Sequence, residues 1–242
     1  MILNTLKRIF FPEVCKNCGD IIPIGHKACS SCGFRMLPRV SEDFCEHCGS
    51  ESDNCCCGYN GAAYLSHITA PFFYSGEIKE RLHNLKFHQK PEESEFLAHE
   101  MSLRFASVYP NVTPDYVCAV PLTAAKLQKR GYNQSELLAR QVCDELLLDY
   151  TELIIKVKDT LNQHNLSKQD RLNNLNSAFS VNEEFDLSGK TVLLCDDIKT
   201  TGTTLKECSD VLFDAGADDV YCLCAAITDY FVPITWKLDK TR

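Results

Sequence analysis

Apolar runs of strand length alternate along the chain with segments whose apolar residues recur every three or four positions. The runs cover residues 116–120, 192–195 and 220–227, and each is apolar throughout. Continuous runs of this kind are typical of strands that are buried on both faces of a parallel sheet. The amphipathic segments begin near residues 76, 92, 134 and 204. The alternation predicts an α/β fold in which helices flank a parallel sheet.

Two stretches fit this alternation less well. Residues 62–74 are rich in aromatic and β-branched residues, yet Pro71 confines any strand there to the edge of a sheet. Residues 153–157 can form a further strand, and the polar residues 158–176 are predicted to form a mobile loop or hairpin. We therefore divide the chain into a cysteine-rich module at 1–60, a connecting segment with the first helices at 61–110, and an α/β domain at 111–242.

Cysteine is concentrated in the amino-terminal part, where nine of the fifteen residues precede position 58. Six of them form three Cys-x-x-Cys-Gly turns, which begin at Cys15, Cys29 and Cys45. Such a turn directs two thiolates at one metal ion, and two turns complete a tetrahedral zinc site. The first two turns supply the simplest set of zinc ligands, which is Cys15, Cys18, Cys29 and Cys32.

The third turn has no further Cys-x-x-Cys to pair with. Three adjacent cysteines follow it, so a second zinc ion would be held by Cys45, Cys48, Cys55 and Cys57. Two alternatives stay open: the first turn pairs with the third, or the adjacent cysteines are ordinary thiols. A segment this short and poor in large aliphatic residues needs a metal in order to fold, so the expected role of zinc is structural.

Charge and hydropathy restrict the partners of the chain. The formal net charge is -8 and the isoelectric point is near 5.4, so any contact with nucleic acid must be local. No apolar run approaches the ~20 residues of a transmembrane helix, and the first residues lack the cleavage site of a secretory signal. We expect a cytoplasmic protein that does not insert into membranes and whose thiols are reduced.

The segment 191–204 carries the clearest chemical signal. Its apolar run ends in Asp196 and Asp197, at the carboxyl end of a predicted parallel strand, where open α/β sheets bind ligands. Two carboxylates there can accept hydrogen bonds from ribose hydroxyls and help to hold a divalent cation. The next loop offers hydroxyls, backbone N–H groups and a helix amino terminus to a phosphate; it consists of Thr200, Thr201, Gly202, Thr203 and Thr204. The pattern predicts a site for a phosphorylated sugar.

Basic residues follow the strand predicted at 116–120. Lys126, Lys129 and Arg130 lie in what the pattern predicts to be a loop, and a guanidinium such as that of Arg130 can bind two phosphate oxygens at once. Lys86 lies near the end of a predicted helix, and two interpretations of it stay open. It is either a solvated charge on a helix face or a group that points to the phosphate site.

The segment 191–204 resembles the PRPP-binding motif of type I phosphoribosyltransferases, in which an apolar strand, two acidic residues and a Thr-Thr-Gly-x-Thr loop follow one another. With the cysteine turns and the Arg-Gly-Tyr-Asn-Gln run from residue 130, the whole chain resembles the ComF family of competence proteins. The matching positions are Pro121, Leu122, Arg130, Gly131, Asn133, Gln134, Gln163, Arg171, Asn174, Ala178, Phe179, Asp196, Asp197, Thr200, Thr201, Gly202 and Thr203.

The resemblance implies a type I phosphoribosyltransferase-like fold that binds PRPP together with Mg²⁺. The acidic pair and the threonine loop would hold the ribose and its 5′-phosphate. Lys126 and Arg130 would contact the pyrophosphate, and a lid over the site would carry Gln163, Arg171 and Asn174. The alternative for the lid residues is that they only solvate a loop.

Three functions are compatible with these features. In the first, which the resemblance implies, a PRPP-binding protein handles single-stranded DNA in the cytoplasm during natural transformation, and Phe34, Phe44 and Tyr59 could stack bases. In the second, a phosphoribosyltransferase moves phosphoribose from PRPP to an acceptor that no residue identifies. In the third, the cysteine module docks a protein partner such as a competence helicase or an uptake-channel protein.

Overall fold

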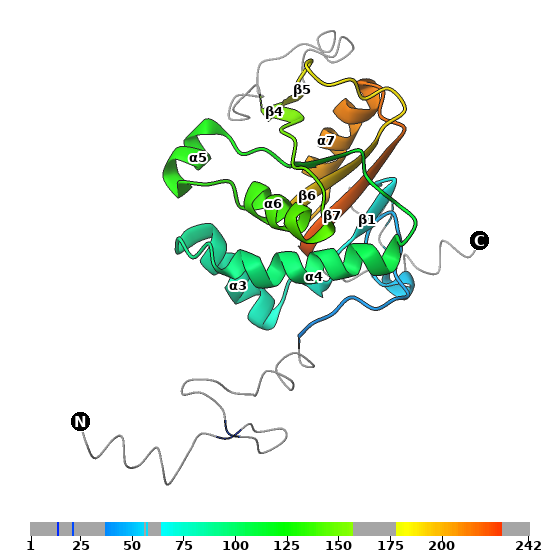
Figure 1. The fold of residues 1–242 in the computed structure, drawn as a ribbon. Helices are drawn as coiled ribbons and strands as arrows, with labels where there is room; N and C mark the ends of the chain where they lie inside the picture. The colour runs from blue at the N-terminus through cyan, green and yellow to red at the C-terminus, as the bar shows by residue number, and fades with distance from the viewer. Residues whose placement is uncertain are drawn as a thin grey trace, which may run out of the picture. The chain divides into compact units, whose positions relative to one another are not determined.

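The computed structural model describes residues 14, 21, 37–55, 57, 64–156 and 178–228. Contacts divide the chain into two compact units, residues 1–38 and 39–242, and each is described by itself. In the first unit, Val14 and Ile21 form an antiparallel bridge. The second unit contains the third Cys-x-x-Cys turn and all the elements labelled in Figure 1.

The predicted runs and amphipathic segments correspond to elements of the second unit, which opens with the short 3-10 helix η1 (Ser52–Asn54). The helices are α3 (Gly76–Phe87), α4 (Glu93–Val108), α5 (Ala124–Arg130), α6 (Gln134–Leu146) and α7 (Thr203–Asp214). The strands are β1 (His67–Thr69), β2 (Phe72–Phe73), β3 (Tyr116–Ala119), β4 (Ile154–Lys156), β5 (Phe179–Val181), β6 (Thr191–Lys199) and β7 (Asp219–Ile227). None of the described helices combines the length and the apolar character that crossing a lipid bilayer requires.

Five strands form one parallel sheet in the described part of the chain, with the order β1-β7-β6-β3 and with β2 also paired to β7. The longest strands are aligned so that Thr191 of β6 lies opposite Asp219 of β7, while Val192 lies opposite Tyr116 of β3. Because β6 has a partner on each edge, it is an interior strand. Its carboxyl end meets that of β3 at one edge of the sheet, where α/β proteins bind ligands.

Helices cover the sheet in two layers (Figure 1). Leu205, Cys208 and Leu212 of α7 belong to one apolar cluster with side chains of β6 and β7 such as Leu194 and Cys222. Helices α4 and α6 contact the sheet through other buried residues, among them Leu97, Met101, Leu138 and Val142. The predicted α/β fold with helices flanking a parallel sheet is therefore confirmed.

The two stretches that fit the alternation less well, residues 62–74 and 153–176, form different structures where they are described. Strands β1 and β2 lie on either side of Pro71, and β7 is the only described strand that pairs with them, which confirms the predicted edge position. Arg39 adds a single antiparallel bridge to Phe72 of β2. Residues Ile154–Lys156 do form a strand, but it joins β5 in a separate antiparallel ribbon rather than the main sheet. Residues 157–177, on which the predicted loop or hairpin falls, lie outside the described residues.

The prediction of a loop after β3 is wrong, because residues 124–130 form helix α5. Thr123 caps its amino end by accepting a hydrogen bond at 3.2 Å from the Lys126 backbone N–H. Gly131 ends it in the left-handed conformation, with φ of 83°. A threonine cap and a terminal glycine are ordinary helix boundaries, but seven residues are too few for apolar periodicity to reveal a helix.

The contrast between buried and exposed leucines on α4 gives a test of this arrangement. The side chain of Leu97 is 0% exposed, whereas that of Leu103 is 53% exposed. Leu97→Ala should lower the free energy of unfolding by about 3 kcal/mol, because it leaves a cavity between α4 and the sheet. Leu103→Ala on the same helix should change it by less than about 0.5 kcal/mol. Urea unfolding measures both, and equal effects would contradict the packing of α4.

Candidate functional site

The acidic pair lies within β6 rather than in a loop beyond it. The hydroxyl of Ser135, in the first turn of α6, donates a 2.7 Å hydrogen bond to Asp196 Oδ1, and the Asp197 backbone N–H donates another at 2.8 Å. Burial and the neighbouring Asp197 carboxylate raise the pKa of Asp196, while these hydrogen bonds oppose the rise. The half-buried Asp196 carboxylate is thus held in a fixed orientation at the carboxyl end of the strand.

Asp197 is paired with a cation from a distant part of the chain. Lys86 Nζ lies 2.9 Å from Asp197 Oδ2, and the two side chains are 19% and 5% exposed. The end of α3 is brought here partly by the Tyr132 hydroxyl, which donates to the carbonyl of Leu85. Of the two interpretations of Lys86, the structure supports the one in which this lysine points to the site.

The loop after the acidic pair leads directly into the amino terminus of α7. Gly202 has φ of 84° and is the residue that precedes the helix, so a side chain here would be strained. The hydroxyls of Thr201 and Thr203 are exposed and 3.0 Å apart. The Lys206 N–H bonds to the carbonyl of Gly202, and the N–H groups ahead of it in the first turn have no acceptor within the helix. The Thr203 N–H makes a long 3.4 Å hydrogen bond to the Thr201 hydroxyl. Hydroxyls, N–H groups of the first turn and the helix dipole together form an anion-binding environment.

Arg130 lies between the site and an exposed aromatic ring. Its Nη1 donates to Gln134 Oε1 at 2.8 Å, and Gln134 precedes the serine that orients Asp196. Its guanidinium also stacks over the ring of Phe87 at 5.2 Å. Lys126 contributes its backbone N–H to the cap of α5, and its side chain is exposed. Arg130 thus contacts the residue before Ser135 and the residue after Lys86, and both Ser135 and Lys86 bind the acidic pair.

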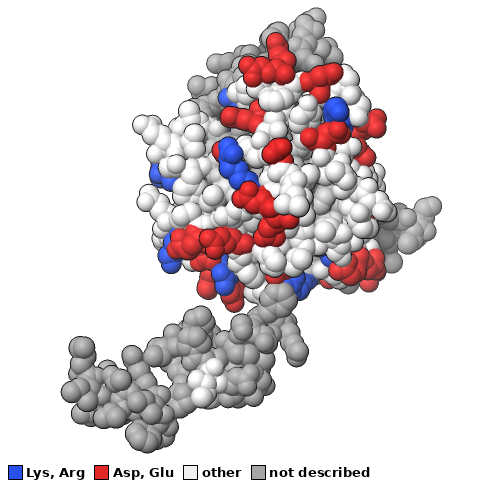
Figure 2. Space-filling view, in the orientation of Figure 1, with Lys and Arg blue, Asp and Glu red and all other residues white. Residues whose placement is uncertain are grey.

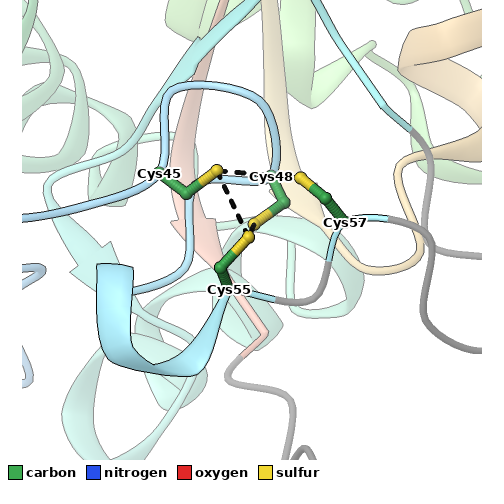
Figure 3. Close-up of side chains that lie close together, drawn as sticks. All are labelled: Cys45, Cys48, Cys55 and Cys57. Carbon is green, nitrogen blue, oxygen red and sulfur yellow. Dashed lines mark hydrogen bonds between the residues drawn. The ribbon is translucent and has the colours of Figure 1, made fainter. Parts of the chain in front are cut away.

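Four cysteine sulfurs of the second unit form a compact cluster, from Cys45, Cys48, Cys55 and Cys57. All lie within 4.8 Å of one another, and individual S···S distances are 3.6, 3.7 and 4.0 Å. Sulfurs bound to one tetrahedral zinc ion at ~2.3 Å would be about 3.8 Å apart. Figure 3 shows the sulfurs pointing toward one another. The number, type and spacing of these donors fit zinc.

The environment of this cluster disfavours ionised thiols in the absence of a metal. Burial is the main cause that raises the pKa of both the Cys45 and Cys57 thiols, and nearby thiols add to it. Hydrogen bonds from the backbone N–H groups of His47 and Cys48 oppose this rise at Cys45. A bound metal cation would lower the thiol pKa values and keep the sulfurs ionised.

Backbone hydrogen bonds join the cysteine turn to the edge of the sheet. Gly49 N–H donates to the Cys45 carbonyl at 2.7 Å and closes the turn, while Ile68 N–H in β1 donates to the Glu46 carbonyl at 2.7 Å. Cys15, Cys18, Cys29 and Cys32 lie outside the described residues, as do Gln163, Arg171 and Asn174. The predictions for these residues stay predictions.

Sequence reasoning missed Ser135 and left Lys86 undecided. No periodicity or motif marks a serine that contacts a carboxylate 61 positions away, and its place in the first turn of a helix near a strand end was the available signal. Phe44, predicted as a surface for base stacking, is half-buried beneath the guanidinium of Arg104 at 4.7 Å. The expectation that Phe44 could stack bases is thus not supported, and Phe34 and Tyr59 lie outside the described residues.

Comparison with known proteins identifies the class. Residues 93–239 match the family model of the phosphoribosyl transferase domain, and they include the acidic pair, the threonine loop and α7. The chain therefore belongs to the phosphoribosyl transferase domain family. The parallel sheet and flanking helices are the type I phosphoribosyltransferase-like fold that was predicted.

Relatives of similar length narrow the class. The DNA utilization protein YhgH of Escherichia coli is 27% identical over 227 residues, which cover 89% of this chain and 98% of the relative. Competence protein F of Haemophilus influenzae is 29% identical over 87% of this chain and 95% of its own length. Competence protein ComFC of Bacillus subtilis is 26% identical over 78% and 79%. The resemblance to the ComF family is confirmed.

Solved structures show more distant likeness. Glutamine phosphoribosylpyrophosphate amidotransferase from B. subtilis has a TM-score of 0.44 and 18% identity, with 60% of this chain and 30% of that chain covered. A hypoxanthine phosphoribosyltransferase from Staphylococcus aureus has a TM-score of 0.36 and 12% identity, over 59% and 70%. The chain thus spans about 30% of the length of the amidotransferase.

The ion pair of Lys86 and Asp197 can be tested by a double-mutant cycle. Lys86→Met should lower the free energy of unfolding by about 2 kcal/mol, because it leaves a buried carboxylate without its cation. In the Asp197→Asn background the same change should cost much less, giving a coupling energy of about 1–2 kcal/mol. Lys90→Met, an exposed charge just beyond α3, is the matched control. Additive effects in urea unfolding would exclude the pair as a stabilising contact.

Proposed function

We propose that this protein binds PRPP with Mg²⁺ at the carboxyl ends of β3 and β6. The observation that carries the proposal is the junction of β6 and α7, where the acidic pair and the open amino terminus of the helix occupy consecutive residues. A ligand that suits both must present vicinal hydroxyls and a phosphate a few ångströms apart. A 5-phosphoribosyl group has this composition, and membership of the phosphoribosyl transferase family agrees with it.

Each part of PRPP has a proposed partner. Asp196 and Asp197 accept hydrogen bonds from the ribose hydroxyls, and residues 200–204 bind the 5′-phosphate. The pyrophosphate lies toward Lys86, which contacts Asp197, and toward Arg130, which contacts Gln134 next to Ser135. Carboxylate oxygens are suitable donors for Mg²⁺, so the acidic pair fits the ion that would neutralise the diphosphate when bound.

The thiol cluster has a structural role in this proposal. Zn²⁺ at Cys45, Cys48, Cys55 and Cys57 would join separate parts of a segment in which the described residues form a single short helix, η1. The ligands leave no open coordination position for a substrate. The zinc site therefore supports folding, and the chemistry of the ligand takes place at the acidic pair.

We further propose that the protein handles single-stranded DNA in the cytoplasm during DNA uptake. Two relatives are named as competence proteins and one as a DNA utilization protein. On the face that Figure 2 shows, basic side chains stand in small groups among more widespread acidic ones, so the contact with DNA is local. Phe87 is 59% exposed and lies under Arg130, which offers a ring for a base next to a cation for its phosphate.

Calorimetric titration with PRPP and Mg²⁺ tests the first part of the proposal. The wild-type protein should bind saturably, and Asp196→Asn with Asp197→Asn should weaken binding by at least ~100-fold, because neutral amides accept the hydroxyl hydrogen bonds poorly and do not hold Mg²⁺. Asp214→Asn with Asp218→Asn makes the same charge change at exposed positions beyond the site and should leave binding unchanged. Undiminished affinity in the first variant would refute the site.

Fluorescence anisotropy with a labelled single-stranded oligonucleotide tests the second part. Binding should weaken steeply as salt is raised, because phosphate contacts release counterions. Phe87→Ala should reduce the affinity by about tenfold through lost stacking, which is worth ~1–3 kcal/mol per base. Leu103→Ala removes an exposed apolar side chain elsewhere and serves as the control. If both variants bind like wild type, Phe87 is not a contact with DNA.

A further inference from the structure

Lys199 is a buried lysine at the end of β6, one position before the phosphate-binding loop. It is 1% exposed, and its Nζ donates a 2.7 Å hydrogen bond to the backbone carbonyl of Cys48. A buried ammonium group has lost most of its hydration, so it is retained only where hydrogen bonds and negative charge compensate for it. Cys48 belongs to the thiol cluster, so a metal that keeps those sulfurs ionised would supply negative charge next to this hydrogen bond.

A zinc-loaded cluster would carry a negative charge, opposite in sign to that of the lysine. Four thiolates around one Zn²⁺ carry a net charge of about −2 in a site that is closed to solvent on the side of Cys48, which is 0% exposed. Groups around metal ligands commonly orient them and tune metal affinity, typically by 10–100-fold. Lys199 is placed to do this through the peptide group of a ligand.

The same strand end is tied to the cysteine turn by packing. Gly49 follows Cys48 with φ of 74°, and a Cβ there would lie 3.4 Å from Ile227 Cδ1. Ile227 is aligned with Lys199 across the β6–β7 ladder, and Thr228 N–H donates to the Lys199 carbonyl at 2.9 Å. The turn that carries the thiols and the residue that precedes the phosphate loop are thus parts of one closely packed structure.

We propose that Lys199 is a positioning residue that links the thiolate metal site to the phosphate-binding loop. Through this link, metal binding holds the end of β6 in the geometry that PRPP requires, and PRPP strengthens metal binding in return. The second half rests on the proposed binding of PRPP at this loop, whereas the first half concerns the metal alone. By linkage, the two affinities must change by the same factor.

Metal binding is measured in the full-length chain with Cys15→Ser and Cys18→Ser. These changes remove two ligands of the other predicted site, so that bound Co²⁺ or Zn²⁺ occupies the cluster of the second unit. Lys199→Met keeps the length of the side chain and removes its charge. It should weaken zinc binding by about tenfold or more in a chelator competition. Lys199→Arg keeps the charge and should recover most of this loss. Lys190→Met, an exposed lysine before the other end of β6, should have no effect. Unchanged zinc affinity in Lys199→Met would overturn the proposal.

The link is tested by adding PRPP and Mg²⁺ to the cobalt-loaded protein. The visible spectrum of bound Co²⁺ should shift in the wild type and in Lys199→Arg but not in Lys199→Met. PRPP should also raise the zinc affinity of the wild type in an equilibrium chelator competition, by at least ~5-fold. Neither effect in a wild type that binds PRPP would refute the link, and this arm decides it even if Lys199→Met does not fold. If the wild type does not bind PRPP, the proposed function fails, while the zinc competition still decides the role of Lys199 at the metal.

Discussion

The pairing of β6 on both edges is the constraint on which the site depends. Its ladder to β7 runs from Thr191 to Lys199, and β3 holds its other edge as far as Cys195. Because β7 pairs with the strand as far as Lys199, the two carboxylates near its end have defined positions, and that of Asp197 can be buried. The price of that burial is offset by partners from two other elements, the hydroxyl of Ser135 on α6 and the ammonium of Lys86 on α3.

The parts of the fold that depend on local pattern were predictable from the sequence. The apolar run before Asp196 is a strand, and the amphipathic segments from residues 76, 92 and 134 are helices α3, α4 and α6. What the sequence could not supply is the set of contacts between distant segments, such as Lys86 with Asp197, because these depend on how helices lie over the sheet. The short helix α5 was missed since it shows no apolar face, with none of its residues buried.

The cysteines illustrate the same division. Spacing predicted that Cys55 and Cys57 would join Cys45 and Cys48, but it left open whether the first turn pairs with the third instead or whether the adjacent cysteines are ordinary thiols. In the structure Cys55 ends a 3-10 turn and Cys57 lies two residues later, so both sulfurs reach the same space. Lys199 could not be recognised beforehand, since a lysine after an apolar strand is usually exposed. Its burial follows from the packing of the cysteine turn against the sheet.

The order of the strands in the sheet differs from their order in the chain, and this affects how the chain can fold while it is being synthesised. Among the described strands, β1 and β2 pair with β7 and with no other, although about 150 residues separate them. Lys199 and Cys48 are 151 positions apart. On the ribosome, the cysteine turn and the edge strands therefore emerge well before their partners exist. Their apolar side chains, such as Ile68 and Phe72, stay without a sheet until β7 has been made, which makes the nascent chain dependent on protection from aggregation.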